Sequence, residues 1–410
     1  MSEQLTAPRG TFDILPEQAA VRAHLERVAA ELLEGAGYGR IETPTFEATE
    51  LFSRGVGEAT DIVQKEMYSF DDGGGRSLTL RPEGTAPVCR AYVQYGMHKL
   101  AQPVRLYYLS SFFRAERPQA GRYRQFWQLG IEALGSDAPE VDAEAIVLLA
   151  TILRRLGVAG LRLRLSSLGS PEARAEYREE LAVYLRGHAE RLAPAVRERI
   201  ELNPLRAFDS SDAATQDVMA GAPKLLERLA PADAEHFADV RGLLERAGVK
   251  YEIDPTLVRG LDYYTRTLFE FTSDALGAQS GVAGGGRYDG LIEQLGGSAT
   301  PGIGWAAGIE RILMAAGEQE LPAPRIDLYL AFEDARADAF ETLASAREAG
   351  LAAQMELAGR SLKGQQKQAE RLGARYFAVV EGDSVRLRDL LAGTEETIAR
   401  SALVQRLVAA

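Results

Sequence analysis

The sequence predicts an α+β fold: a core built on an antiparallel sheet, a helical insertion within that core, and a C-terminal α/β domain. Three patterns support this fold class. Residues 105–134 hold two strand-forming runs, the second with one apolar and one polar face, which is typical of antiparallel sheets. Residues 166–240 are rich in Ala, Arg and Glu and predict only helices. Residues 325–410 alternate strand-forming and helix-forming runs, which indicates a largely parallel sheet.

The composition restricts the class of protein. The chain has 410 residues, of which 46% are hydrophobic and 26% charged, with a net charge of −12; these values are typical of a soluble protein of two or three domains. Its single cysteine, Cys89, excludes an intrachain disulfide, and its four scattered histidines indicate no metal site. The longest apolar run, near 145–153, is far shorter than the ~20 residues of a membrane-spanning helix. We therefore expect a cytoplasmic protein without a membrane segment.

The N-terminal part of the chain predicts helices and strands in alternation. An apolar stripe predicts a helix over 17–36. RIETPTF predicts a strand over 40–46, and SLTL predicts another over 77–80. Helices are expected around 88–93 and over 140–156.

The two strand-forming runs at 105–114 and 122–135 are the clearest pattern in the chain. In the second run, Tyr123, Trp127 and Leu129 belong to a mostly apolar face. The opposite face gathers charged, amide and aromatic side chains, namely Arg122, Arg124, Phe126, Gln128, Gly130 and Glu132. A polar face in water and a ligand platform fit this pattern equally well on its own.

The stretch that follows the insertion predicts strands at 251–254 and 261–271, a glycine-rich segment, and a helix that begins near Gly304. In that helix Gly304, Gly308 and Arg311 would share one face. Because glycine inside a helix costs about 0.5–1 kcal/mol, a close approach of a neighbour or a ligand is expected. Simple helix packing beneath a surface arginine is the alternative.

Familiar nucleotide-binding motifs are absent from the sequence. There is no P-loop, and the run Gly302–Gly308 departs from the dinucleotide fingerprint because its last gap is three residues instead of two. No histidine lies in these motifs, so a histidine-based nucleophilic mechanism has little support. Arg259 precedes a predicted strand with paired tyrosines; it suits a phosphate clamp or an ordinary ion pair with a carboxylate.

Positive charge is concentrated in two segments despite the acidic total. Residues 99–127 carry six basic side chains against one acidic one, a local charge of +5. Residues 360–375, in the C-terminal domain beyond a predicted linker at 318–326, carry five basic side chains against one acidic one, a local charge of +4. The basic residues of this second segment recur at helical spacing, as Arg360, Lys363, Lys367 and Arg371. A solvated helix face and an RNA-binding face both fit this spacing.

Several motifs together resemble one family. The segments Phe113–Glu116 and Arg122–Phe126 resemble motif 2 of the class II aminoacyl-tRNA synthetases, Gly302–Arg311 resembles motif 3, and the region around Pro44 resembles motif 1. Two further segments resemble the histidine-specific signatures of the histidyl-tRNA synthetase family, namely LVRGLDYY at 257–264 and AGGGRYD at 283–289. PRGTFDILP at 8–16 and LRPEGTA at 80–86 are also similar to that family. The resemblance covers essentially the whole chain, in the expected order.

The resemblance implies a fold, a reaction and partners. It implies a class II synthetase core over 1–165 and 241–320, a helical insertion domain over 166–240, and an anticodon-binding domain over 325–410. The family activates L-histidine with ATP and Mg²⁺ to histidyl-adenylate and pyrophosphate, and then transfers histidine to the 3′-terminal adenosine of tRNA(His). Motif 1 in this class forms part of a homodimer interface, so a homodimer is implied as well.

The resemblance also assigns residues to roles. The catalytic residues would be Arg114, Arg259 and Arg311. The ATP-binding residues would be Arg114, Glu116, Arg122, Phe126 and Arg311, with Phe126 stacked on the adenine. The histidine-binding residues would be Glu83, Thr85, Arg114, Gln128, Glu132, Arg259, Tyr263 and Tyr264, with Glu132 and Tyr264 on the two imidazole nitrogens. No metal-ligating side chains are implied.

Two other classes of protein remain as alternatives. A regulatory subunit of ATP phosphoribosyltransferase shares the catalytic fold and senses histidine without charging tRNA. Such subunits typically lack the C-terminal domain and the catalytic arginines, both of which this chain has. A pure RNA-binding module would leave Arg259 and Arg311 unexplained.

Overall fold

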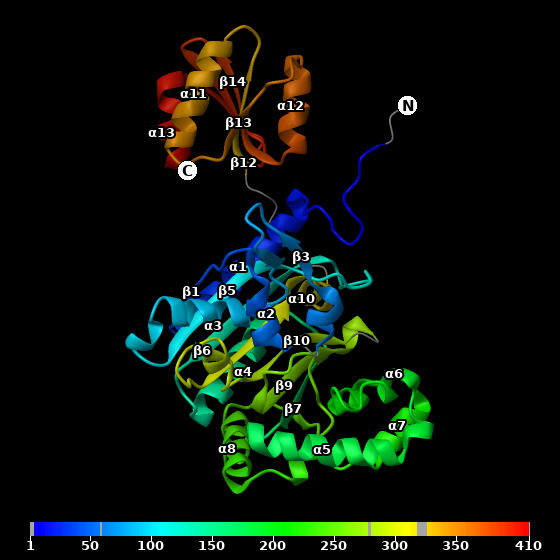
Figure 1. The fold of residues 1–410 in the computed structure, drawn as a ribbon. Coiled ribbons are helices and arrows are strands. Elements are labelled where there is room, and N and C mark those ends of the chain that lie inside the picture. The colour runs from blue at the N-terminus through cyan, green and yellow to red at the C-terminus, as the bar shows by residue number, and fades with distance from the viewer. Residues whose placement is uncertain (1–3, 58–59, 278–279, 318–325, 410) are drawn as a thin grey trace. The chain divides into compact units, whose positions relative to one another are not determined.

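A computed structural model describes residues 4–57, 60–277, 280–317 and 326–409. The chain forms two compact units, Met1–Gln319 and Glu320–Ala410 (Figure 1). The linker predicted over 318–326 lies almost entirely outside the described residues.

An eight-stranded sheet forms the centre of the first unit. Its central strands pair antiparallel, and the short edge strands β1 and β8 pair parallel to their neighbours. This confirms the predicted antiparallel core. The strands are, in spatial order, β1 (Gly39–Arg40), β5 (Val104–Phe113), β6 (Gln125–Leu134), β11 (Gly302–Gly308), β10 (Gly281–Arg287), β9 (Thr265–Ser273), β7 (Leu161–Ser167) and β8 (Glu252–Ile253).

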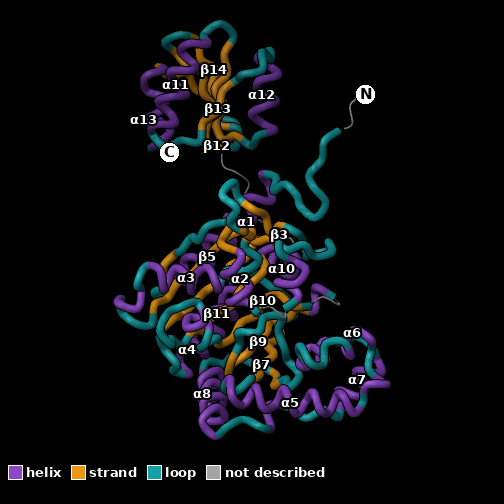
Figure 2. The backbone as a smooth tube through the Cα atoms, viewed as in Figure 1, coloured by secondary structure: helices purple, strands orange, loops and turns teal. Residues whose placement is uncertain are grey.

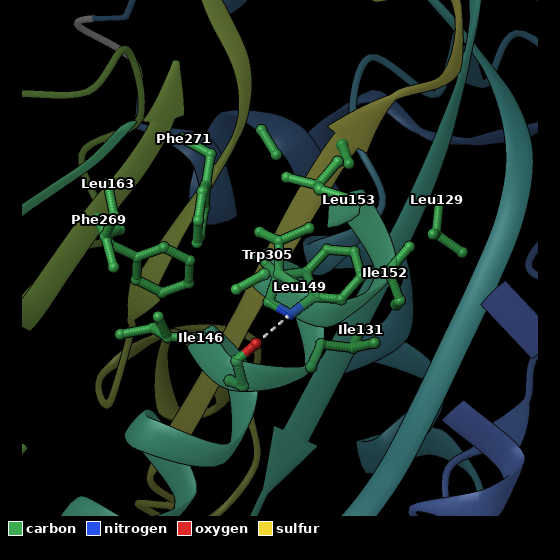
Figure 3. Packing of buried hydrophobic residues seen from close by; sticks show 14 of the residues in the cluster. Leu129, Ile131, Ile146, Leu149, Ile152, Leu153, Leu163, Phe269, Phe271 and Trp305 are labelled. Atoms are coloured by element: carbon green, nitrogen blue, oxygen red, sulfur yellow. Dashed lines mark hydrogen bonds between the residues drawn. The ribbon is translucent and has the colours of Figure 1, made fainter. Parts of the chain in front are cut away.

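One face of this sheet is covered by three long helices, α1 (Pro16–Gly35), α4 (Pro139–Arg155) and α8 (Pro231–Arg246). Leu129 and Ile131 point into this layer from β6 and belong to its apolar cluster. Trp305 anchors the centre, because its ring is buried among Leu149 and other side chains of α4 while Nε1 donates to the Ala145 carbonyl at 2.9 Å (Figure 3). The predicted apolar face of the second run is therefore confirmed.

The opposite face of the sheet carries a second apolar cluster and the polar side chains of β6. Helices α3 (Thr85–Gln94) and α5 (Pro171–Gly187) supply side chains to this cluster, together with Tyr108 and Phe112 of β5. A separate three-stranded sheet is ordered β2 (Phe46–Ala48), β4 (Ser77–Leu80), β3 (Tyr68–Asp71), and α2 (Thr49–Val56) directly follows its first strand.

The insertion leaves the sheet after β7 and is built from helices and turns (Figure 2). It contains α5, α6 (Pro194–Arg197), a 3₁₀ turn at Pro204–Asp209 and α7 (Ala213–Ala220), so the predicted helical character is confirmed. Its last helix, α8, packs against α4 as part of the core. The domain boundaries given above remain predictions.

Three local predictions are wrong. The strand expected over 40–46 is interrupted, and Arg81 donates there to the carbonyls of Thr43 and Pro44. Arg122 and Arg124 precede β6 instead of belonging to it. The helix expected from Gly304 is strand β11, and α10 (Ile309–Ala316) begins only after Gly308.

The C-terminal unit is a five-stranded sheet with helices α11 (Arg336–Glu348), α12 (Leu362–Arg371) and α13 (Leu403–Val408). The largely parallel sheet that we expected is half antiparallel, because a tight hairpin at Gly382 (φ 65°) reverses the chain after β14. The strand order is β13 (Ala353–Met355), β12 (Ile326–Phe332), β14 (Ala374–Glu381), β15 (Ser384–Asp389) and β16 (Glu395–Ala399). Within the described residues, no helix combines the length and apolarity needed to cross a membrane.

Candidate active site

A polar cavity of about 640 Å³ lies on the β6 face opposite the long helices, bounded by β6, β10, α10 and the turn Pro204–Asp209. Its walls are rich in charge of both signs. The arginines of the wall are Arg114, Arg122, Arg164, Arg206, Arg259 and Arg311, and the carboxylates are Asp61, Glu66, Glu116, Asp209, Glu270 and Glu310. Guanidinium groups match the geometry of phosphate oxygens, so this wall suits a phosphorylated ligand.

Arg114 is fixed at the end of β5 beside an aromatic ring. Its Nε donates to the Pro82 carbonyl at 2.9 Å, and its guanidinium carbon lies 5.3 Å from the centre of the Phe126 ring. Glu116 lies 3.7 Å from Arg114 and 3.4 Å from Arg122 through its two carboxylate oxygens. A cation and an aromatic face next to each other suit a phosphate attached to a planar base.

Arg259 enters the cavity from the loop before β9. Its NH1 donates to Glu270 Oε1 at 2.6 Å, so the ordinary ion pair considered above is formed. Burial acts to lower the pKa of Arg259, but the negative charge of Glu270, together with Tyr263, Tyr264 and Asp209, outweighs burial and raises that pKa above its ordinary value. A side chain at Gly284 would bring its Cβ within 2.6 Å of Arg259 NH2. Glycine at 284 therefore makes the room that this guanidinium occupies.

Arg311 projects from the first turn of α10. Its Nε donates to the Gly281 carbonyl, and burial together with the nearby Arg122 lowers its pKa. The preceding Glu310 accepts a hydrogen bond from the Trp127 amide at 3.1 Å and one from Arg22 at 2.5 Å. These bonds fix the start of the helix against β6. An anion bound between Arg122 and Arg311 would offset the repulsion between these two side chains.

A buried polar network centred on Glu132 lies on the same face of β6. Glu132 is fully buried and accepts hydrogen bonds from the hydroxyls of Thr85 (2.8 Å), Tyr108 (3.4 Å) and Tyr288. Burial raises the pKa of Glu132 to about 8. Glu83, whose pKa burial also raises, accepts from the backbone amides that open α3, so it fixes the position of Thr85.

Glycines in neighbouring strands make room for this network. A Cβ at Gly304 would overlap Glu132 Oε2, and a Cβ at Gly130 would overlap the Tyr108 ring. Gly304 pairs with Glu132 across the β6–β11 ladder. The glycine pattern that we interpreted as a helix face therefore reflects space for a carboxylate on the adjacent strand.

Gln128 carries an unsatisfied polar atom at the cavity wall. Its Oε1 is buried and has no hydrogen-bond partner among the residues that the structure describes, although the side chain lines the cavity. A buried acceptor without a partner costs about 1–3 kcal/mol. A ligand that carries a donor, such as an amino group, would recover this cost.

Comparison with known proteins identifies the family. A family model described as histidyl-tRNA synthetase matches residues 10–312. The chain belongs to the histidyl-tRNA synthetase family. A histidine–tRNA ligase of Halorhodospira halophila is 52% identical over 380 residues, which cover 92% of this chain and 89% of the relative. One of Desulforudis audaxviator is 47% identical over 412 residues and covers 98% of each chain.

A solved structure supports the same family. The apo histidyl-tRNA synthetase of S. aureus superposes with a TM-score of 0.82 at 35% identity, over 99% of this chain and 100% of that one. The match includes a large sheet with helices and a separate C-terminal sheet unit, so the class II synthetase fold implied by the sequence is confirmed.

The structure distributes the predicted site residues over two layers. Seven line the cavity, namely Arg114, Glu116, Arg122, Phe126, Gln128, Arg259 and Arg311. The other five, Glu83, Thr85, Glu132, Tyr263 and Tyr264, are buried and do not line it. The two tyrosine rings lie 4.8 Å apart, and Tyr263 lies 5.7 Å from the Tyr288 ring. These five side chains therefore lie behind the cavity wall in this structure.

Sequence reasoning missed three side chains that support these residues. Tyr108 and Tyr288 hold Glu132, and Glu270 holds Arg259. Tyr288 lies inside the AGGGRYD segment, so the motif itself could have drawn attention to it. Tyr108 and Glu270 carry no local signal, because their roles depend on neighbours that are distant in sequence.

Proposed function

We propose that the protein activates L-histidine with ATP to histidyl-adenylate and then transfers the histidine to the 3′-terminal adenosine of tRNA(His). One observation carries this proposal: three arginines, Arg114, Arg259 and Arg311, line a single cavity beside the unsatisfied Gln128. The relatives that share about half of the sequence are named histidine–tRNA ligases.

The nucleotide would lie along the arginine-lined wall. Phe126 stacks on the adenine, and Glu116 accepts a hydrogen bond from the adenine amino group. Arg114 and Arg311 hold the phosphates, while Arg122 neutralises Glu116 at 3.4 Å. This division of roles uses aromatic surface for the base and guanidinium groups for the anionic end.

The first chemical step needs no general base. The histidine carboxylate attacks the α-phosphorus of ATP, a new oxygen–phosphorus bond forms, and the bond to the bridging oxygen of pyrophosphate breaks. Arg114 and Arg259 stabilise the charge on the α-phosphoryl oxygens in the transition state. Positioning of the two reactants supplies much of the remaining rate enhancement.

The amino acid would be recognised by the buried polar network. Glu83, Thr85 and Gln128 engage the amino-acid backbone, and Glu132 and Tyr264 engage the two imidazole nitrogens; Tyr263 completes the wall of the pocket. A site that hydrogen-bonds both nitrogens leaves buried polar groups unpaired when a wrong amino acid enters. Such sites discriminate by roughly 10⁴–10⁵-fold without editing.

ATP would enter as its Mg²⁺ complex. Mg²⁺ commonly relies on substrate phosphates and one or two carboxylates instead of an all-protein cage. No cluster of three or more His, Cys, Asp or Glu side chains suited to a metal occurs among the described residues. Glu270 is already bonded to two arginines, so the phosphates themselves would supply most of the ligands.

Two macromolecular contacts belong to the proposal. The exposed side chains of Lys363, Lys367 and Arg371 recur along α12 and would contact the phosphates of the tRNA anticodon arm. A second copy of the chain would cover the motif 1 region, where Phe46 and Phe70 are 50% and 44% exposed and their rings lie 6.2 Å apart. The cytoplasmic location expected from the sequence stays a prediction.

Charging of total tRNA tests the proposal. Purified protein is incubated with labelled histidine, ATP, Mg²⁺ and unfractionated tRNA, and acid-precipitable label is counted. The proposal predicts histidine attached to tRNA in an ATP-dependent reaction. Histidine binding without charging would instead favour the regulatory-subunit alternative, and tRNA binding without histidine binding would favour the RNA-binding module.

A further inference from the structure

Arg174 connects the helical insertion to the segment that carries the paired tyrosines. It lies in α5, its side chain is 12% exposed, and its NH1 donates to the carbonyls of Asp262 (2.7 Å) and Tyr264 (2.8 Å). These two carbonyls flank Tyr263 on either side. One guanidinium group therefore fixes the backbone that sets the direction of both tyrosine rings.

A second part of the insertion holds the same segment. Asn203 Nδ2 donates to Asp262 Oδ1 at 3.1 Å, and the Asp262 amide donates to the Val56 carbonyl at 3.3 Å. Arg174 NH2 lies 3.8 Å from that Asp262 oxygen, so its closest bonds go to backbone carbonyls and not to a carboxylate. Arg174 therefore acts mainly on the backbone of this segment and not through an ion pair.

The chain just beyond the tyrosines is strained and also depends on the insertion. Arg266 has a left-handed backbone (φ 42°), which costs a non-glycine residue free energy and persists only where the surroundings enforce it. Its amide donates to the Gly169 carbonyl at 2.8 Å, and its carbonyl accepts from the Leu168 amide at 2.7 Å. Its side chain pairs with Asp233 at 3.2 Å. Residues at both ends of the insertion thus hold the segment from 262 to 266.

We propose that Arg174 is a positioning residue for Tyr263 and Tyr264, through which the insertion sets the affinity of the active site for histidine. The inference rests on the proposed function, because it takes these tyrosines as part of the histidine pocket. Tyr263 packs against Tyr288, which donates to Glu132, so a displacement of the tyrosine segment would alter the geometry of the proposed histidine pocket. Arg174 acts on this segment and touches neither substrate.

Substitution of Arg174 separates this role from a purely structural one. Arg174→Gln removes the cation and shortens the side chain, and Arg174→Lys keeps the charge but loses the planar fork. The matched control is Arg178→Gln, one turn further along α5, whose guanidinium donates to the Leu202 carbonyl at 2.8 Å at the protein surface. Histidine-dependent ATP–pyrophosphate exchange is measured for each, together with the melting temperature.

We expect Arg174→Gln to raise the KM for histidine about tenfold, with the KM for ATP changed by less than about twofold. Arg174→Lys should lie between this variant and the wild type, and Arg178→Gln should match the wild type. An unchanged KM for histidine, or equal increases in both KM values, would overturn the inference. If Arg174→Gln does not fold, Arg174→Lys decides by the same criterion. Failure of the proposed function is distinguishable, because the wild type itself would then show no histidine-dependent exchange.

Discussion

Arg259→His removes the guanidinium that faces the cavity from the loop before β9, and it tests the proposed chemistry. The native side chain bonds to Glu270 at 2.6 Å and is 28% exposed. Glu270 keeps a second partner, Arg164 NH1 at 3.0 Å. The substitution therefore leaves no unpaired buried carboxylate, and we expect the melting temperature to change little.

The effect on rate follows from the position of the lost donor. Removal of one preorganised donor to transition-state charge typically costs 10²–10³-fold in kcat, which corresponds to roughly 3–4 kcal/mol. In the proposed pocket the imidazole is held by Glu132 and Tyr264, which are buried and do not line the cavity wall with Arg259. We therefore expect kcat for adenylate formation to fall on the order of 10²–10³-fold, while the dissociation constant for histidine changes by less than about fivefold.

The assay is histidine-dependent ATP–pyrophosphate exchange at saturating substrate, with histidine binding measured separately by calorimetry. The control is Arg162→Gln, which removes another arginine–carboxylate pair, with the exposed Asp274 at 3.0 Å, on strand β7 away from the cavity. Exchange close to the wild-type rate in Arg259→His, or an equal loss in both variants, would refute the assigned role.

Three further outcomes are expected. Because burial raises the pKa of Glu132 to about 8, the native state keeps a proton that the unfolded chain releases; the free energy of unfolding should fall by up to about 1.4 kcal/mol per unit as pH rises from about 5 to about 8. Glu132→Gln should abolish this contribution, and parallel urea-unfolding profiles of the two proteins across that range would contradict it. Gly304→Ala should lower the free energy of unfolding by about 1–3 kcal/mol or more through overlap with Glu132. The control, Gly242→Ala, lies in open space on α8 and should raise it by about 0.5–1 kcal/mol. Equal melting temperatures for the two variants would refute the steric argument. Lys367→Glu should raise the KM for tRNA and reduce its salt dependence without changing pyrophosphate exchange, and an unchanged KM for tRNA would exclude α12 from the RNA interface.

The sequence predicts the fold well where a pattern is local. The alternation along β6 places Phe126, Gln128 and Glu132 on one face and Leu129 on the other, and the structure has this arrangement. The order of the family motifs along the chain can likewise be recognised from the sequence alone. An alternating pattern predicts the two faces of a strand correctly because successive side chains point to opposite sides of the sheet.

Prediction fails where the reason for a residue lies in a distant part of the chain. Gly304 and Gly308 are spaced as on a helix. Position 304 requires glycine, however, because a Cβ there would overlap Glu132 in the neighbouring strand. No motif in the sequence marks Arg174, whose guanidinium donates to carbonyls about ninety residues away. Such contacts depend on tertiary packing that no short window of sequence contains.

The acidic total of the chain was a poor guide to its ligands. The net charge of −12 belongs to the whole sequence, whereas the cavity wall gathers six arginines, alongside six carboxylates, from segments far apart in the chain. Local placement of cations, and not the sum, determines where an anion binds.

We propose that this cavity activates histidine, and an exchange assay with each of the twenty amino acids in turn is the decisive experiment. Purified wild-type protein is incubated with ATP, Mg²⁺, labelled pyrophosphate and one amino acid at a time, and label recovered in ATP is counted. We expect exchange with histidine and rates at least about 10⁴-fold lower with every other amino acid. Exchange with a different amino acid, or none with histidine, would contradict it.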